Sequence, residues 1–317
     1  MFKLLERIWD VAINRIVSFL PSATELLYEL DAQDRLYGVT HECNFPEEAS
    51  TKPRVIQSVF EPESMSSKEI DQKILELVSS GKDIYELQIK NLKKANPDLI
   101  ISQEICEVCS AYTNQVNNAM KILDKKPEIF AMNPHDIHGI LNNIKEISKK
   151  IHASEKGIKL VESLKKRIEF CKEKQVSRIP KVLAIEWIEP FYTAGHWVPE
   201  MIEFVGATNL ISKTSEHSRK IIFDQIKNSD PDIIIMMPCG FNVQRTIEEY
   251  NNDLKSNHVW QNLRAVEDKN VFAVDANSYF SKPSIRTITG IEILGKIIHP
   301  DEFSQMQVPD ESFRKIN

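Results

Sequence analysis

Thiols and one imidazole form the clearest chemical signal in the chain. His41 and Cys43 stand in THECN, and Cys106 and Cys109 stand in EICEVC. One imidazole with three thiolates suits zinc or another transition metal in a tetrahedral site. The CxxC pair also suits a dithiol redox function, because the turn after a strand can lower a thiol pKa. A third interpretation is that these thiols are small buried groups beside a cleft.

A second signal is the density of aromatic side chains in EWIEPFYTAGHW, residues 186–197. Trp187 and Trp197 predict an apolar wall for a large, flat ligand, although the same rings also fit the core of a lobe. His196 fits three roles, which are an axial metal ligand, a hydrogen-bond donor and a satisfied polar group. Gly195 lets the backbone approach a ligand closely.

Composition excludes several classes of function. The chain has 317 residues, with 40 basic and 46 acidic side chains and a net charge of −6, which argues against a nucleic-acid partner. No apolar run approaches the roughly 18 residues of a membrane helix, so we expect a protein that does not span a membrane. Residues 1–14 lack the apolar stretch of a secretory signal, which predicts a cytoplasmic protein, or a cell-surface or periplasmic one if the native start differs.

Strand signals alternate with helical signals along the chain, which predicts an α/β protein with mostly parallel sheets. Glycine-rich phosphate loops and a GxSxG elbow are both absent from the sequence. Glu42, Glu104 and Glu107 offer acid/base groups, but nothing places them across a reacting bond. Binding is therefore favoured over catalysis.

A sequence pattern that occurs twice in the chain predicts two lobes. LQIKNLKKANPDLIIS (87–102) resembles FDQIKNSDPDIIIMM (223–237), and each reads as a helix end, a Pro-Asp stop and a buried strand. Between them, residues 136–176 contain no proline and repeat isoleucine and leucine at helical spacing, as in one long helix or two end to end. The predicted units are an amphipathic helix (1–14), a first α/β lobe (15–135), a linking helix (136–176), a second α/β lobe (177–300) and a loose polar tail (301–317).

The motifs RIVSFLPSATELLYEL, THEC, QEICEVC, TAGHWVPE and SYFSKPSIRTITGIEILGKIIHP resemble the cobalamin-binding branch of the substrate-binding proteins of ABC importers. The resemblance covers about residues 15–300. It implies two Rossmann-like lobes joined by one long helix, a class III periplasmic-binding-protein-like fold. It also implies a corrinoid, such as cobalamin, held between the lobes.

Ligands of parallel sheets bind beyond the carboxyl ends of the strands. Carried over by position, the resemblance implies ligand contacts at this edge from Pro21, Ser22, Glu42, Trp187, His196, Trp197, Tyr279 and Phe280. The set His41, Cys43, Cys106 and Cys109 stays the candidate metal site.

Transport members of the family carry one surface acid in each lobe, which docks on arginines of the permease. Asp224 aligns with that position in the second lobe, whereas Lys90 aligns with it in the first. Since no signal peptide is recognisable, we expect an intracellular relative that binds a corrinoid or another metal-bearing ligand. The alternative is a metal-binding or thiol-redox protein centred on His41 and the three cysteines.

Overall fold

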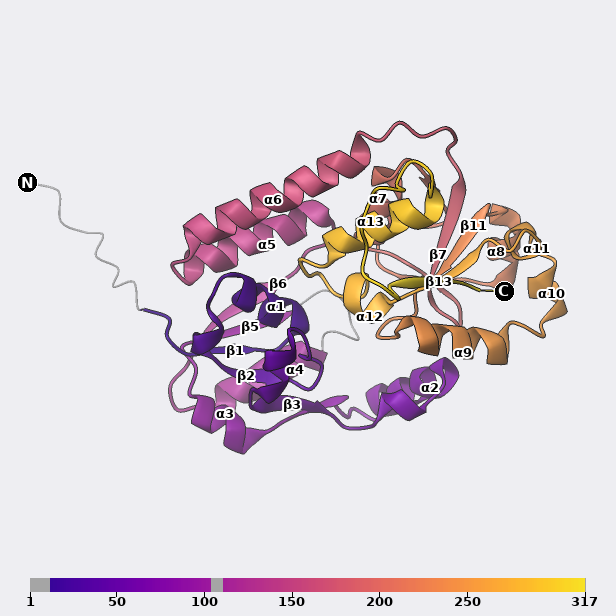
Figure 1. Cartoon of the computed structure of the whole chain (residues 1–317). Helices are drawn as coiled ribbons and strands as arrows, with labels where there is room; N and C mark the ends of the chain where they lie inside the picture. Colours follow the sequence, from indigo (N-terminus) through magenta and orange to yellow (C-terminus); the bar gives the residue numbers. More distant parts are fainter. Residues whose placement is uncertain (1–11, 104–110, 317) are drawn as a thin grey trace, which may run out of the picture.

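A computed structural model describes residues 12–103 and 111–316, which form two α/β lobes (Figure 1). The first lobe is built on a six-stranded sheet in the order β4-β3-β2-β1-β5-β6, parallel except for β4. Its strands are β1 (Ile16–Ser18), β2 (Leu36–Thr40), β3 (Arg54–Ser58), β4 (Tyr85–Leu87), β5 (Leu99–Gln103) and β6 (Glu128–Met132). Its helices are α1 (Pro21–Glu29), α2 (Ser67–Ser79), α3 (Ile89–Ala95) and α4 (Ala111–Ile122), with 3-10 turns at Gln33–Arg35, Glu47–Thr51 and Pro62–Ser64.

The second lobe has a sheet in the order β10-β8-β7-β11-β12-β13, and β9 pairs with β7. Its strands are β7 (Lys181–Trp187), β8 (Tyr192–Thr193), β9 (Thr208–Asn209), β10 (Arg219–Lys220), β11 (Ile233–Met236), β12 (Val271–Val274) and β13 (Phe313–Ile316). Its helices are α7 (Val198–Phe204), α8 (Phe223–Ser229), α9 (Val243–Asp253), α10 (His258–Gln261), α11 (Arg264–Glu267), α12 (Ala276–Tyr279) and α13 (Thr287–Ile298). The two predicted lobes are therefore present.

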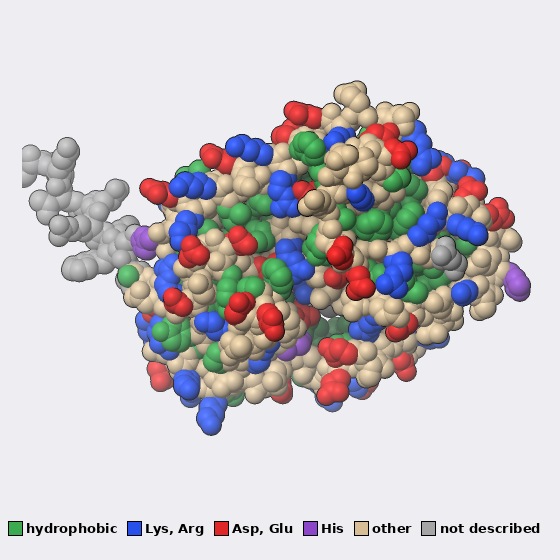
Figure 2. All heavy atoms as spheres, in the orientation of Figure 1, with side chains coloured by type: hydrophobic (Ala, Val, Ile, Leu, Met, Phe, Trp, Pro, Cys, Tyr) green, Lys and Arg blue, Asp and Glu red, His purple; other side chains and the backbone are tan. Residues whose placement is uncertain are grey.

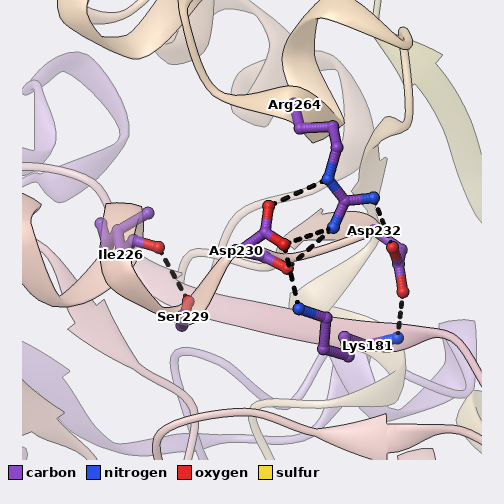
Figure 3. Close-up of polar contacts among 6 residues, drawn as sticks. All are labelled: Lys181, Ile226, Ser229, Asp230, Asp232 and Arg264. Atoms are coloured by element: carbon purple, nitrogen blue, oxygen red, sulfur yellow. Dashed lines mark hydrogen bonds and ion pairs between the residues drawn. The ribbon is translucent and has the colours of Figure 1, made fainter.

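The two echoed segments fold in the same way. Asn96 ends α3 and Asp230 ends α8, both with left-handed backbone, and a proline then directs the chain into a buried central strand. In the second lobe, Arg264 and Lys181 hold the carboxylate of Asp230, and Arg264 also bonds Asp232 (Figure 3). These donors lower the pKa of Asp230 to about 2.

The link between the lobes differs from the one long helix, or two helices end to end, that the sequence predicts. Two helices, α5 (Ile137–Lys150) and α6 (Ser154–Lys172), lie side by side as a hairpin (Figure 1). The chain reverses at residues 151–153, where His152 takes a left-handed conformation. Gly157 lets the helices approach, because a Cβ there would stand 2.0 Å from the Ser148 hydroxyl.

The C-terminal tail also differs from the prediction. Residues 313–316 form β13, which pairs antiparallel with β12 and completes one edge of the second sheet. The predicted helix at 1–14 lies mostly outside the described residues, and residues 12–14 are not helical. Within the described residues, no helix is both long and apolar enough to cross a membrane.

Residues 59–84, between β3 and β4, form an arm that leaves the first lobe. The segment from the start of this arm to β5 contains α2, β4 and α3. The helix α2 begins with a capping box in which Ser66 and Glu69 satisfy each other's backbone N–H groups. Figure 1 shows α2 beneath α9 of the second lobe, on the opposite side of the molecule from α5 and α6.

Candidate functional site

The carboxyl ends of the parallel strands in both lobes face a hollow between them, visible in Figure 2. One contact across it joins Glu25 of α1 to Arg286, with 3.4 Å between Oε1 and Nη1. The Arg286 guanidinium also lies over the rings of Phe45 and Tyr279, at 4.1 and 4.9 Å from their centroids. Burial raises the pKa of Glu25 in spite of Arg286. Tyr279, a predicted ligand contact, thus lies at the junction of the lobes.

Three histidines meet where the lobes face each other. His135 follows β6 of the first lobe, while His196 follows β8 and His217 precedes β10 in the second. The ring centroid of His196 lies 5.9 Å from that of His135 and 5.1 Å from that of His217, and His135 and His217 are 5.5 Å apart. Of the three, only His196 was predicted from the sequence.

His196 is held in an unusual backbone conformation, with φ of 54°. Its backbone N–H donates to the carbonyl of Glu216 at 2.6 Å, and its own carbonyl accepts from Ser215 at 2.9 Å. Burial, with His217 and His135 adding to it, lowers the pKa of the imidazole to about 4. Nδ1 is buried and has no hydrogen-bond partner, and the same holds for His135. His196 is therefore a neutral imidazole at physiological pH.

Acidic and thiol groups stand beside the histidines. Glu186 lies at the end of β7, where the N–H of Gly195 donates to its carboxylate at 3.4 Å and burial raises its pKa. Cys239 follows β11, and its backbone N–H donates to the carbonyl of Glu186. The pKa of the Cys239 thiol is raised to about 12 by burial, and then by Glu186 and by Glu42 of the other lobe. Solvent reaches Cys239, and the effect of Glu42 on its thiol puts it close to the first lobe as well.

The two predicted aromatic contacts from residues 186–197 have different environments. Trp187 is half-buried at the end of β7, and its ring packs edge-on against Phe241 with centroids 5.5 Å apart. Trp197 is instead core, only 4% exposed, and its indole N–H donates to the carbonyl of Phe280 at 2.9 Å. Phe280 is 3% exposed. The structure therefore places Trp197 and Phe280 behind the wall of the site and leaves Trp187 at its surface.

Three further predicted contacts lie at strand ends of the first lobe. Pro21 and Ser22 begin α1 and are buried, and the Ser22 hydroxyl has no hydrogen-bond partner. Glu42 follows β2, and its backbone N–H donates to Thr40 Oγ1 at 3.3 Å. Glu42 helps to raise the pKa of the Cys239 thiol, so this carboxylate lies near Cys239 of the second lobe.

The predicted metal ligands are not assembled in the part of the chain that is described. Cys43 is fully buried in the core, and its sulfur is bonded by the hydroxyls of Thr24 and Thr40 at 3.1 and 3.3 Å. Burial raises its thiol pKa, whereas a metal ligand needs the thiolate. His41 packs against Tyr85 instead, with centroids 5.7 Å apart. Cys106 and Cys109 lie outside the described residues, and within those residues no group of three His, Cys, Asp or Glu is placed to hold a metal ion.

Sequence reasoning missed His135, His217, Glu186 and Cys239 as residues of the hollow. His135 follows a strand end in EIFAMNPHD, so the rule that selected His41 also applies to it. His217 carried no such signal, because the strand it precedes, β10, has only two residues.

Comparison with known proteins agrees with this architecture. Residues 16–278 match the family described as periplasmic binding protein. A Vitamin B12-binding protein of Vibrio campbellii is 24% identical over 257 residues, which are 78% of this chain and 80% of that protein.

Solved structures share the fold. The periplasmic Vitamin B12 binding protein BtuF of Vibrio cholerae superposes with a TM-score of 0.65 at 19% identity, over 93% of this chain and 99% of that one. A periplasmic heme binding protein of Pseudomonas aeruginosa gives a TM-score of 0.66 at 16% identity, over 91% and 94% of the two chains.

Proposed function

Since the chain belongs to the periplasmic binding protein family, we propose that it binds a corrinoid, or a related metal-bearing macrocycle such as haem, in the hollow between its lobes. The observation that carries the proposal is the position of His196, whose ring contacts His135 of the other lobe where the two lobes face each other. A neutral imidazole is a good ligand for cobalt or iron. The relatives named for vitamin B12 support the choice of a corrinoid.

The surroundings of His196 fit a large ligand with an apolar body and polar edges. Trp187 offers a half-buried aromatic face, and Glu186 and Glu42 line the polar side. Sites for small molecules combine such apolar walls with a few placed polar groups. In this role the protein performs no covalent chemistry on its ligand.

An ABC permease is the partner that the family relation supports, and the proposal extends to it. Asp224 and Lys90 are both exposed at the second position of equivalent helices, α8 and α3. A permease that fits this chain would therefore present a basic group to one lobe and an acidic group to the other. Lys90→Glu would weaken binding to such a permease and strengthen binding to one with arginines at both positions.

Titration of cyanocobalamin and of haemin into the wild type, His196→Ala and Trp187→Ala tests the proposal. Loss of one buried aromatic contact should weaken affinity about 5- to 150-fold, the equivalent of roughly 1–3 kcal/mol. His258→Ala is the control, because His258 is exposed on α10, which lies on the side of the second lobe that faces away from the first lobe (Figure 1). Absence of binding of either ligand at millimolar concentration contradicts the proposal, and equal binding by all variants would place the site elsewhere.

A further inference from the structure

The arm of residues 59–84 is anchored to the second lobe by polar contacts at the start of α2. The backbone N–H of Ser67 donates to Glu249 Oε1 at 2.6 Å, and both residues are buried. The Ser67 hydroxyl in turn accepts from the backbone N–H of Glu189 at 3.2 Å. These bonds join segments more than 120 residues apart, so they tie the lobes together.

Arg245 of α9 provides the second anchor. Its Nη2 donates to the carbonyls of Pro62 and Met65 in the arm, at 2.6 and 2.8 Å. Its guanidinium also lies 3.7 Å from the centroid of Phe241, and Phe241 packs against Trp187. The wall of the hollow and the arm are therefore in continuous contact through these three side chains.

The position of the arm gives these anchors a consequence. The hairpin of α5 and α6 lies along one side of the hollow, and the arm crosses the opposite side (Figures 1 and 2). We propose that the arm is a gate which closes the hollow opposite the α5–α6 hairpin, and that Arg245 and Glu249 hold it shut. Exchange of a bulky ligand requires release of these anchors. The inference goes beyond the proposed function and does not depend on which ligand binds.

The first test measures release of the arm by peptide-resolved hydrogen exchange. Glu249→Ala removes a buried acceptor, a loss of about 1–3 kcal/mol, so exchange within residues 59–84 should accelerate about 5- to 150-fold. Arg245→Ala should act in the same direction. Glu249→Gln keeps an oxygen acceptor and should have a smaller effect. Glu248→Ala is the matched control, because Glu248 is exposed on the same helix and contacts Gln244.

The second test measures access to the hollow without any ligand. Cys239 is labelled with a small reagent, methyl methanethiosulfonate, and separately with a bulky one, fluorescein maleimide, and mass spectrometry of its peptide gives both rates. Because both reagents react with the same thiolate, the ratio of the bulky reagent's rate to the small reagent's rate does not depend on the raised thiol pKa. It should rise in Glu249→Ala and Arg245→Ala in proportion to the gain in exchange.

Two results would overturn the inference. Unchanged exchange in both alanine variants would show that these side chains do not hold the arm. Faster exchange with an unchanged labelling ratio would show that the arm does not limit access to the hollow. Either result is independent of cyanocobalamin and haemin binding, so it is distinguishable from failure of the proposed function.

Discussion

Asp98 and Asp232 occupy equivalent positions in the two lobes, just before β5 and β11 respectively. Each accepts hydrogen bonds from backbone N–H groups at the start of the first strand of its lobe, β1 or β7. Asp98 Oδ2 accepts the backbone N–H groups of Asn14 and Arg15, just before β1, both at 2.9 Å. Asp232 Oδ2 accepts the N–H of Lys181, the first residue of β7, at 2.6 Å. The repeated Pro-Asp pair thus has two roles. The proline follows the end of a helix, and the aspartate bonds the backbone at the start of the first strand of its lobe.

Asp232→Asn should therefore lower the free energy of unfolding by about 1–2 kcal/mol, because it weakens charge-assisted bonds to Lys181 and Arg264. Urea unfolding measures the change. Asp268→Asn, at an exposed position, should stay within about 0.5 kcal/mol of the wild type.

The same aspartate predicts a pH dependence. Burial raises the pKa of Asp232, but the bonds from Lys181 and Arg264 outweigh burial and hold it below its usual value. A pKa that is lower in the folded than in the unfolded state contributes stability above about pH 4, and this contribution disappears as the pH falls through the folded pKa. The stability difference between wild type and Asp232→Asn should therefore shrink as the pH falls below about 4. A constant difference would contradict this assignment.

Arg167 of α6 fixes the linking hairpin to α13 of the second lobe. Its guanidinium donates to both carboxylate oxygens of Glu292, at 2.8 and 2.6 Å, and Glu292 is 8% exposed. Arg167→Ala leaves that carboxylate buried without its partner and should cost about 3–5 kcal/mol. The double variant Arg167→Leu with Glu292→Leu should recover part of this loss in urea unfolding. If the double variant loses as much unfolding free energy as the two single variants lose in sum, the two residues act independently.

His196 should remain neutral far below the usual imidazole range, since burial and the neighbouring histidines lower its pKa to about 4. Titration followed by NMR of its ring proton tests this value. Because the folded pKa lies below the unfolded one, the stability that depends on a neutral His196 is present above about pH 6.5 and is lost as the pH falls toward 4. His258, which is exposed, serves as the reference ring in the same spectrum.

Trp197 separates stability from ligand binding. Trp197→Phe removes the indole donor and leaves the buried carbonyl of Phe280 without it, which should cost about 1–3 kcal/mol of stability. Affinity for cyanocobalamin or haemin should change little, since the ring lies in the core. If Trp197→Phe weakens binding as much as Trp187→Ala does, then the ring at position 197 contacts the ligand after all.

The two-lobe fold was predictable because its signals are local. Buried strand runs, the Pro-Asp junctions and the alternation of elements each occupy fewer than twenty residues. The α5–α6 hairpin was not predictable in the same way, because residues 151–153 contain neither proline nor glycine. There a histidine takes the left-handed conformation that usually signals glycine, and helix packing stabilises the turn.

The candidate site was predictable only in part, because burial depends on contacts between distant segments. Trp187 and Trp197 look alike in the sequence, yet the segment between α12 and α13 covers Trp197, whose indole N–H donates to the carbonyl of Phe280, while Trp187 stays half-buried. Cys43 follows a strand as predicted, but Thr24 from α1 holds its sulfur in the core. The arm was missed because its contacts with α9 join residues about 180 positions apart.

The arm also changes which rigid-body motion the lobes can make. Two lobes that are joined along one side only can swing apart about that joint. A second attachment on the opposite side of the hollow prevents this motion. With both α5–α6 and the arm in place, the remaining freedom is a rotation about the line that joins the two attachments. Such a rotation opens the hollow on one face of the molecule while it closes it on the other, with His135 and His196, which come from opposite lobes, 5.9 Å apart between the two walls.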